Sequence, residues 1–335
     1  MNEGQRFRSI VGTLFLFLLA LSFLSAAPRA ELLWVAHGGP SQSLDWTIDV
    51  CVAPDGKIWV ADISDRFFIF NPQGELIETW GKSGTGPGEF RFYRPRDTTS
   101  NFWLSADLLF LPDGSFLVSD FLNHRIQHFD SQRNFIGLWG PEDLLPVQLI
   151  LSPSGEVIAS FMSHHDIYRY DLQGRALGVL DLGETLYGSL ASEPRGLGGI
   201  GMDKAGHIMV SETRKNHIFV FDTSGKESGR IGELDRTVYG GLKASWEKLE
   251  DVNGNIVVAD SDNHRVVVFD KSGRFAFDFG GYGAGDGDFR FVASIALDGL
   301  GNIYVADEVG KALKKYALIG MPSENPVPGA KRPLD

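Results

Sequence analysis

The sequence has a single cysteine, no excess of positive charge and only one long hydrophobic run. Cys51 cannot form an intramolecular disulfide, so the fold must be held by its core alone. Cys51 lies in an apolar stretch, where we expect an inert thiol. The chain carries 31 Lys and Arg against 43 Asp and Glu, a formal net charge of −12. We therefore expect no nucleic-acid partner, because phosphate backbones are bound by clustered cationic side chains.

The hydrophobic run covers residues 10–24, after Arg6 and Arg8 and before the small residues 25–27. This order is typical of a secretory targeting segment. Fifteen apolar residues fit a cleaved signal peptide, whereas the 18 counted to Ala27 leave an uncleaved signal anchor open. We expect residues 1–27 to direct a secreted or extracytoplasmic location, periplasmic or extracellular. If the segment is retained, it tethers the protein to the membrane.

A repeated unit of three strands and three turns is clearest at residues 251–280. Asn253-Gly254-Asn255 is a tight-turn sequence, because Gly and Asn tolerate positive φ. Residues 256–259 are mostly β-branched and apolar on both faces, as in a strand buried between sheets. No helical period is present in this unit.

Copies of the unit predict the architecture. Their turn glycines lie 41 to 58 residues apart: Gly56, Gly114, Gly155, Gly206, Gly254 and Gly301. This period is typical of propeller blades. The sixth copy ends after its third strand, and an unassigned strand, residues 31–36, precedes the first copy. We predict an all-β, six-bladed β-propeller of four-stranded antiparallel blades over residues 31–319, closed by the N-terminal strand completing the last blade. Residues 320–335 are expected to form a disordered, Pro-rich tail.

Several motifs carry a family resemblance. Residues 120–126 and 260–266, both with an Asn-His-Arg turn, resemble the signature of NHL-repeat β-propellers, as do the Gly-rich linkers 84–90 and 283–289. The resemblance extends over residues 31–318, and it is strongest in copies two and five and weakest in copy three. It implies that the Asn-His-Arg turns are structural and that the aspartates closing the second strands bond adjacent blades.

A row of polar residues stands seven positions before the turn glycines, near one mouth of the expected central channel: Asp49, Asp107, Gln148, Gly199, Glu247 and Ser294. Glycine is common there in NHL repeats. Converging carboxylates repel one another unless a positive group joins them, and Ca²⁺ takes oxygen ligands. Asp49, Asp107 and Glu247 are thus candidate ligands of Ca²⁺ or another divalent cation, and no other cofactor is indicated. The alternative is that these side chains extend into a water-filled channel.

The inner strand of copy five is unusual because Lys248 and Glu250 stand where the other copies have apolar residues. An internal ion pair is one interpretation, and such pairs sometimes mark function. A bulge or register shift that exposes both side chains is the other.

These observations favour a binding module over an enzyme. The ligand-binding candidates are Asp49, Asp107, Gln148, Glu247 and Lys248, at the channel mouth of a rigid ring of turns. The expected partner is a protein, a peptide or a small ligand, bound by a monomer. The alternative is a metal-dependent hydrolase or lyase that uses the carboxylate row, and no catalytic residue is assigned.

Overall fold

The computed structural model describes residues 27–94, 103–162, 164–187, 197–211, 217–232, 240–243 and 245–320. The expected targeting segment and C-terminal tail therefore lie outside the described residues, apart from Ala27 and Gly320, as do residues 95–102 between the first two blades. Within these ranges, no helix is long and apolar enough to cross a membrane.

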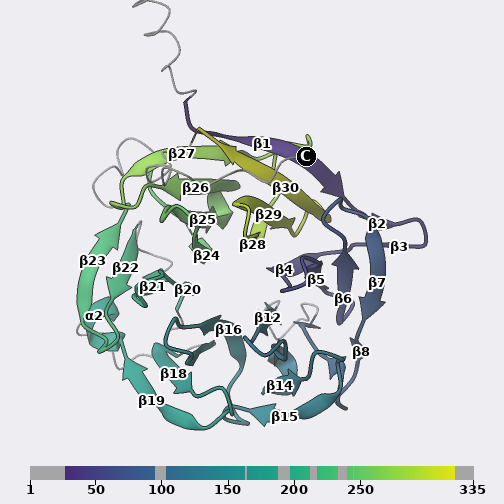
Figure 1. The fold of residues 1–335 in the computed structure, drawn as a ribbon, viewed down its shortest axis with the longest axis vertical. Helices are drawn as coiled ribbons and strands as arrows, with labels where there is room; N and C mark the ends of the chain where they lie inside the picture. Colours follow the sequence, from purple (N-terminus) through teal and green to yellow (C-terminus); the bar gives the residue numbers. More distant parts are fainter. Residues whose placement is uncertain are drawn as a thin grey trace, which may run out of the picture.

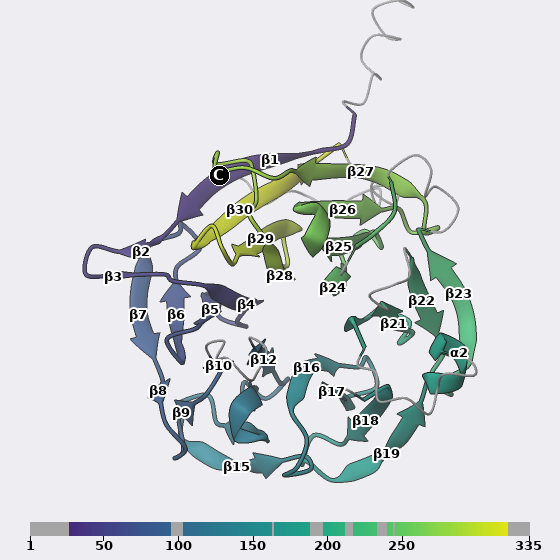
Figure 2. The same cartoon turned by 180° about the vertical axis from the view of Figure 1, so that it is seen from behind.

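Six four-stranded antiparallel blades surround a central axis (Figures 1 and 2). From the inner to the outer strand, blades one to three are β4 (Thr47–Val52), β5 (Ile58–Asp62), β6 (Arg66–Phe70), β7 (Leu76–Trp80); β12 (Asp107–Phe110), β13 (Phe116–Asp120), β14 (Arg125–Phe129), β15 (Phe135–Trp139); and β16 (Pro146–Leu151), β17 (Val157–Phe161), β18 (Asp166–Tyr170), β19 (Ala176–Asp181). Blades four to six are β20 (Gly199–Met202), β21 (Ile208–Ser211), β22 (Ile218–Phe221), β23 (Glu227–Ile231); β24 (Ser245–Glu250), β25 (Ile256–Asp260), β26 (Arg265–Phe269), β27 (Phe275–Gly280); and β28 (Val292–Leu297), β29 (Asn302–Asp307), β30 (Ala312–Ile319), β1 (Arg29–Ala36).

Short elements connect the blades. Three two-stranded ladders pair β2 (Gly38–Gly39) with β3 (Gln42–Ser43), β8 (Lys82–Ser83) with β9 (Glu89–Phe90), and β10 (Tyr93–Arg94) with β11 (Trp103–Leu104). Two 3-10 turns, η1 (Phe121–Asn123) and η3 (Ser261–Asn263), and one helix, α2 (Gly183–Tyr187), complete the described elements.

The predicted ring closure is confirmed. The N-terminal strand β1 is the outer strand of blade six and pairs antiparallel with β30, from Arg29 opposite Ile319 to Ala36 opposite Leu313. This pairing gives β30 a partner on its outer side, so blade six has the same four strands as the others. Figure 1 shows the purple and yellow strands side by side at the top of the ring.

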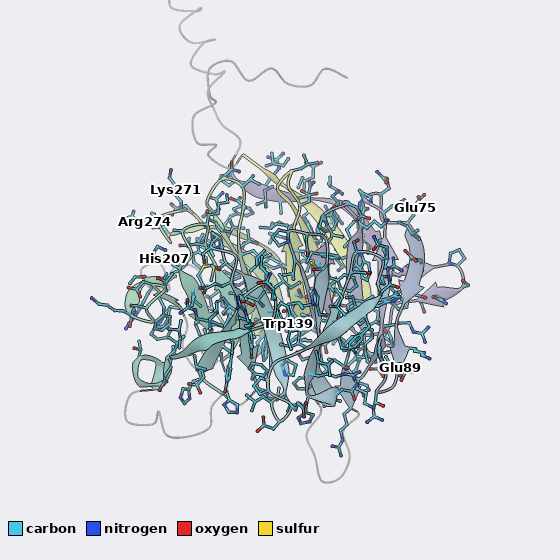
Figure 3. The ribbon with its side chains drawn as sticks, turned by 60° about the horizontal axis from the view of Figure 1, so that its bottom comes forward. Glu75, Glu89, Trp139, His207, Lys271 and Arg274 are labelled. Carbon is cyan, nitrogen blue, oxygen red and sulfur yellow. The ribbon has the colours of Figure 1, made fainter. Side chains whose placement is uncertain are left out.

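The core lies between neighbouring blades because the middle strands are apolar on both faces. All five residues of β5 and all five of β25 are buried, and each packs on the blade that precedes or follows it. Aromatic side chains fill the space between blades one and two, where Trp59 contacts Phe110 and Phe116 at centroid distances of 5.8 and 5.6 Å. Charged side chains such as Glu75 and Lys271 lie at the periphery (Figure 3).

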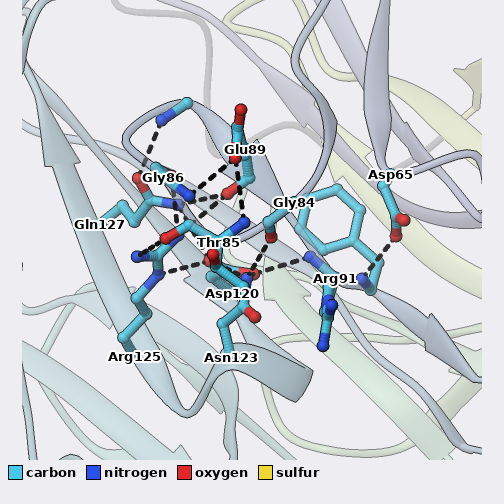
Figure 4. A network of polar contacts seen from close by, with 12 residues as sticks. Asp65, Gly84, Thr85, Gly86, Glu89, Arg91, Asp120, Asn123, Arg125 and Gln127 are labelled. Atoms are coloured by element: carbon cyan, nitrogen blue, oxygen red, sulfur yellow. Dashed lines mark hydrogen bonds and ion pairs between the residues drawn. The ribbon is translucent and has the colours of Figure 1, made fainter.

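The motif Asp120–Arg125 ties blade two to the linker that leaves blade one (Figure 4). The Asp120 carboxylate accepts from the backbone N–H of Arg91 at 2.8 Å and from Nε of Arg125 at 2.6 Å. The same guanidinium donates to the carbonyl oxygens of Thr85, at 2.7 Å, and Gly86, at 2.9 Å. The expected structural role of this turn, and of the aspartate before it, is confirmed.

Candidate functional site

The polar row predicted at the channel mouth gathers around one cavity of about 520 Å³, called here the mouth cavity. Asp49, Asp107, Gln148, Glu247 and Ser294 all line it. Their strands begin at the same end of the ring, which places the row on a single level. The remaining lining is mostly apolar: Ile48, Leu104, Ala106, Val147, Met162, Trp246, Phe291 and Ala293, with Ser105 and Glu308.

Four row residues connect neighbouring blades. Each accepts a hydrogen bond from a backbone N–H of the next inner strand. The pairs are Asp49 with Leu108 (3.2 Å), Asp107 with Leu149, Gln148 with Ile200 (2.7 Å) and Ser294 with Val50 (3.3 Å). These four contacts, called here the inter-blade ties, join blade one to two, two to three, three to four and six to one, and the side chains are held in place by the backbone they bind.

β-Bulges aim most of these side chains. The pairing of the inner strand with its neighbour shifts register between Thr47 and Asp49, and the same shift recurs before Gln148 and Ser294. A bulge re-aims a side chain by inserting one residue into the strand. The shift in blade five lies between Ser245 and Lys248 and also inserts one residue into β24.

Blade four has glycine in the row because its inner strand pairs directly with blade five. β20 and β24 form a parallel ladder in which Gly201 lies opposite Lys248. Gly199 has φ of +152°, and a Cβ atom there would lie 1.9 Å from the carbonyl oxygen of Trp246. No side chain fits at this position, so blades four and five are connected here by the backbone pairing of β20 with β24.

The side chain of Glu247 bonds to blade three rather than to the next blade. Its Oε2 accepts from Nε2 of Gln148, two blades away, at 2.9 Å. Burial, then the charge of Asp49, raises the pKa of Glu247 to about 8. Lys248 does not line the cavity. It is fully buried and donates to the carbonyl oxygens of Ser245 and Trp246 at 3.2 and 2.9 Å.

The two interpretations of Lys248 and Glu250 need correction. The bulge is present, but Lys248 is buried, not exposed, and burial lowers its pKa to about 7. Glu250 does not pair with Lys248. Instead its carboxylate lies 3.8 Å from the amine of Lys204 in blade four and accepts from the Lys204 backbone N–H.

Asp49 is buried, and Asp107 of the neighbouring blade is half-buried. Burial raises the pKa of Asp49 to about 6, against the opposing hydrogen bonds from Ser294 and others. Burial, then the charge of Asp49, raises the pKa of Asp107 well above its usual value. The negative charge of either acid therefore disfavours ionisation of the other.

Metal ligation by the row requires the carboxylates to converge. Among the residues that the structure describes, only His165, Asp166 and Asp181 bring three such ligand atoms within 4.8 Å of one another. Asp49, Asp107 and Glu247 do not form such a group, and the first two already accept hydrogen bonds from backbone and hydroxyl donors. Binding of Ca²⁺ by these three residues would therefore require side-chain movement.

Glu308 is a cavity residue that the sequence did not single out. It follows Asp307 at the end of β29, and the corresponding residues Ile63, Phe121, Met162 and Ser261 are uncharged. Only 8% of Glu308 is exposed, and burial raises its pKa to about 7. An acid at this otherwise uncharged position was visible in the sequence once the six copies were aligned.

Comparison with known proteins supports the repeat assignment. A protein family described as a 6-bladed beta-propeller matches residues 242–326. RING finger protein nhl-1 of Caenorhabditis elegans is 48% identical over 54 residues, 16% of this chain and 5% of that protein. Protein brain tumor of Drosophila melanogaster is 40% identical over 47 residues, 14% of this chain and 4% of that protein.

The chain is an NHL-type six-bladed β-propeller. Its similarity to these two proteins spans only a small part of their length. The structure of virginiamycin B lyase from Staphylococcus aureus is similar to this propeller with a TM-score of 0.55 and 13% identity, over 87% of this chain and 100% of that one. At this identity the likeness concerns the fold alone.

The NHL-type turns place their histidines away from the cavity. His124 and His264 follow η1 and η3 in the left-handed conformation, with φ of 54° and 57°. They belong to blades two and five, on opposite sides of the ring, and neither lines the mouth cavity. Both histidines are therefore part of the turns and not of the mouth cavity.

Proposed function

We propose that this NHL-type propeller is a binding module that holds a protein, a peptide or a small ligand at the mouth cavity. The observation that supports the proposal is the cavity itself. Its volume of about 520 Å³ lies in the range of pockets that enclose small ligands or side chains. Apolar walls over a few fixed polar groups are the composition of such pockets.

The walls come from several blades, which favours recognition by a rigid surface. Met162 follows the second strand of blade three, Trp246 begins blade five and Phe291 precedes blade six. Rings of turns positioned by a stable scaffold are common binding surfaces. The inter-blade ties hold the row residues in place without any contribution from a ligand.

We place this binding outside the cytoplasm. The proposal rests on the apolar run at residues 10–24, which follows two arginines and precedes small residues. Expression of the full chain with a reporter at its C-terminus, followed by protease treatment of cells whose outer barrier is opened and whose cytoplasmic membrane is intact, tests it. Protection of the reporter from protease in cells whose outer barrier has been opened would contradict the location.

The binding role is tested by filling the cavity. Ala293→Phe adds a ring at the wall, and Leu300→Phe is its control, because Leu300 is 87% exposed in the turn at the opposite end of β28. A photo-reactive residue at Phe291 should cross-link a defined ligand in cells, and Ala293→Phe should abolish the adduct. Equal adducts in the two variants, or none at Phe291, would refute the binding role of this face.

A further inference from the structure

Glu308 is the acid of the mouth cavity for which no protein partner is found. It lines the cavity and is 92% buried, since only 8% of it is exposed. No hydrogen bond or ion pair joins its carboxylate to any described residue; its backbone alone is bonded, to Phe291 and Lys311. The other acids of the cavity, in contrast, accept hydrogen bonds from named donors.

A buried carboxylate without a donor is costly, because desolvation disfavours its charge. The neighbouring charge of Asp307 adds to the effect of burial. A cation that enters the cavity would supply the missing partner. The same cation would also meet the charge of Asp49, which lines the cavity and whose pKa of about 6 leaves it ionised above neutral pH.

The walls indicate what kind of cation fits. Ile48, Val147, Met162 and Phe291 offer apolar surface, and the indole of Trp246 offers a face that attracts cations. A hydrated metal ion gains nothing from such walls. An ammonium or guanidinium group on an apolar body buries that body against them.

We propose that the mouth cavity is a site for an organic cation, an ammonium or guanidinium group carried on an apolar stem or ring, with Glu308 as its counter-ion. The inference rests on the proposed binding function. The cation is either a free amine or the Lys or Arg side chain of a protein partner, since both present the same group. In either case, the charged head lies at Glu308 and the stem lies against the apolar wall.

Calorimetry on the full chain in detergent at about pH 8 tests the charge preference. The probes are phenethylammonium, the neutral phenethyl alcohol, the anionic 3-phenylpropionate, calcium chloride, and capped tripeptides with a central Lys, Arg or Gln. We expect the ammonium to bind at least about tenfold more tightly than the alcohol, and the anion not at all. Tighter binding of the Lys or Arg peptide identifies a protein source, and tighter binding of phenethylammonium identifies a free amine.

Glu308→Gln should lower the affinity for the cation about tenfold and leave the affinity for the alcohol unchanged. Glu142→Gln is the matched control, because Glu142 is exposed in the loop that leads into β16 and does not line the cavity. Glu308→Gln should fold, since no protein donor loses its acceptor; a melting temperature no lower than that of the unmutated protein verifies this.

Three outcomes overturn the proposal: equal affinity for ammonium and alcohol, no binding of any organic cation up to about 10 mM, or tight binding of Ca²⁺ with none of the amines. Failure of this inference is distinguishable from failure of the binding role. If Ala293→Phe abolishes the cross-link at Phe291 while the amines show no preference, the binding role stands and the cation assignment falls.

Discussion

The carboxylate of Asp49 accepts a hydrogen bond of 2.7 Å from the hydroxyl of Ser294, a residue 245 positions away in the chain. The hydroxyl oxygen in turn accepts from the backbone N–H of Val50 at 3.3 Å. Blades one and six are therefore joined at the axis by this pair, while β1 completes blade six at the rim. The first and last blades are thus joined both near the axis and at the rim.

Loss of the hydrogen bond between Asp49 and Ser294 should lower the free energy of unfolding whether or not a metal ion is present. Asp49→Ala leaves the Ser294 hydroxyl without this acceptor, whereas the Leu108 N–H keeps the Asp107 carboxylate at 2.9 Å, so we expect a loss of about 1–2 kcal/mol in the free energy of unfolding. Ser294→Ala removes one donor and should cost about 1 kcal/mol. Urea unfolding with and without a chelator measures both. If the chelator lowers the stability of the unmutated protein as much as Asp49→Ala does, the row acts through a bound cation instead.

The closing strand can be tested by cross-linking. Glu31 and Ala317 are register partners in the β1–β30 ladder, so cysteines at both positions should form a disulfide. In a Cys51→Ala background, the oxidised protein should migrate faster on a non-reducing gel and gain about 4 kcal/mol against unfolding, because the bond closes a very long loop. The control pair of cysteines at Glu31 and Leu300 should stay reduced. Failure of the first pair to oxidise would show that β1 does not close the ring.

The guanidinium of Arg125 should contribute more to the free energy of unfolding than a surface ion pair does. Its guanidinium donates to the fully buried Asp120 and to three carbonyl oxygens of the preceding linker, those of Thr85, Gly86 and Glu89. Arg125→Ala leaves a buried carboxylate with fewer donors and should cost about 3 kcal/mol. Arg125→Lys should recover less than half of this loss, because an ammonium cannot match the planar fork.

Arg175→Ala is the control for this comparison, since Arg175 is 80% exposed and pairs with Asp171 in its own turn. We expect a cost of about 0.5 kcal/mol or less. Thermal or urea unfolding of the three variants separates the two classes. Equal losses for Arg125→Ala and Arg175→Ala would contradict a structural role for the motif.

The repeat made the fold predictable, whereas the site depended on local geometry. Turn glycines and short apolar strands recur at blade spacing, so the number of blades and the role of the N-terminal strand follow from the sequence. Five of the six row residues line one cavity, because position within a repeat fixes position along the axis.

The contacts of the row could not be predicted in the same way. Asp49 and Gln148 meet the next blade because β-bulges aim them, and bulges leave no clear sequence signal. An ion pair of Lys248 with Glu250 was one interpretation and a register shift that exposes both was the other, but the register shift buries the amine of Lys248 among backbone carbonyls. The partner of a charged residue depends on such shifts, which periodicity alone does not reveal.

The raised pKa values of the acidic side chains in the mouth cavity should make the free energy of unfolding depend on pH. The native pKa values of Asp49, Glu308 and Glu247 are raised to about 6, 7 and 8, whereas unfolded carboxyls titrate near about 4. Between these limits the native state holds more protons than the unfolded state. The free energy of unfolding must therefore fall as pH rises from about 5 to 7.

Lys248 acts in the opposite direction at higher pH. Its native pKa is lowered to about 7, so above this pH the unfolded chain binds the additional proton and stability rises with pH. Because the acids and this lysine overlap near about pH 7 to 8, the steepest fall is expected below that range.

Glu308→Gln isolates one of these groups. The variant lacks the carboxyl that retains its proton up to about pH 7, so its unfolding free energy should fall less steeply between about pH 5 and 7. The difference should correspond to about one proton, and urea unfolding at closely spaced pH values measures it. Glu142→Gln, at an exposed site, should keep the slope of the unmutated protein. A slope unchanged by Glu308→Gln would mean that Glu308 is ionised throughout the range, and that a partner already compensates its charge.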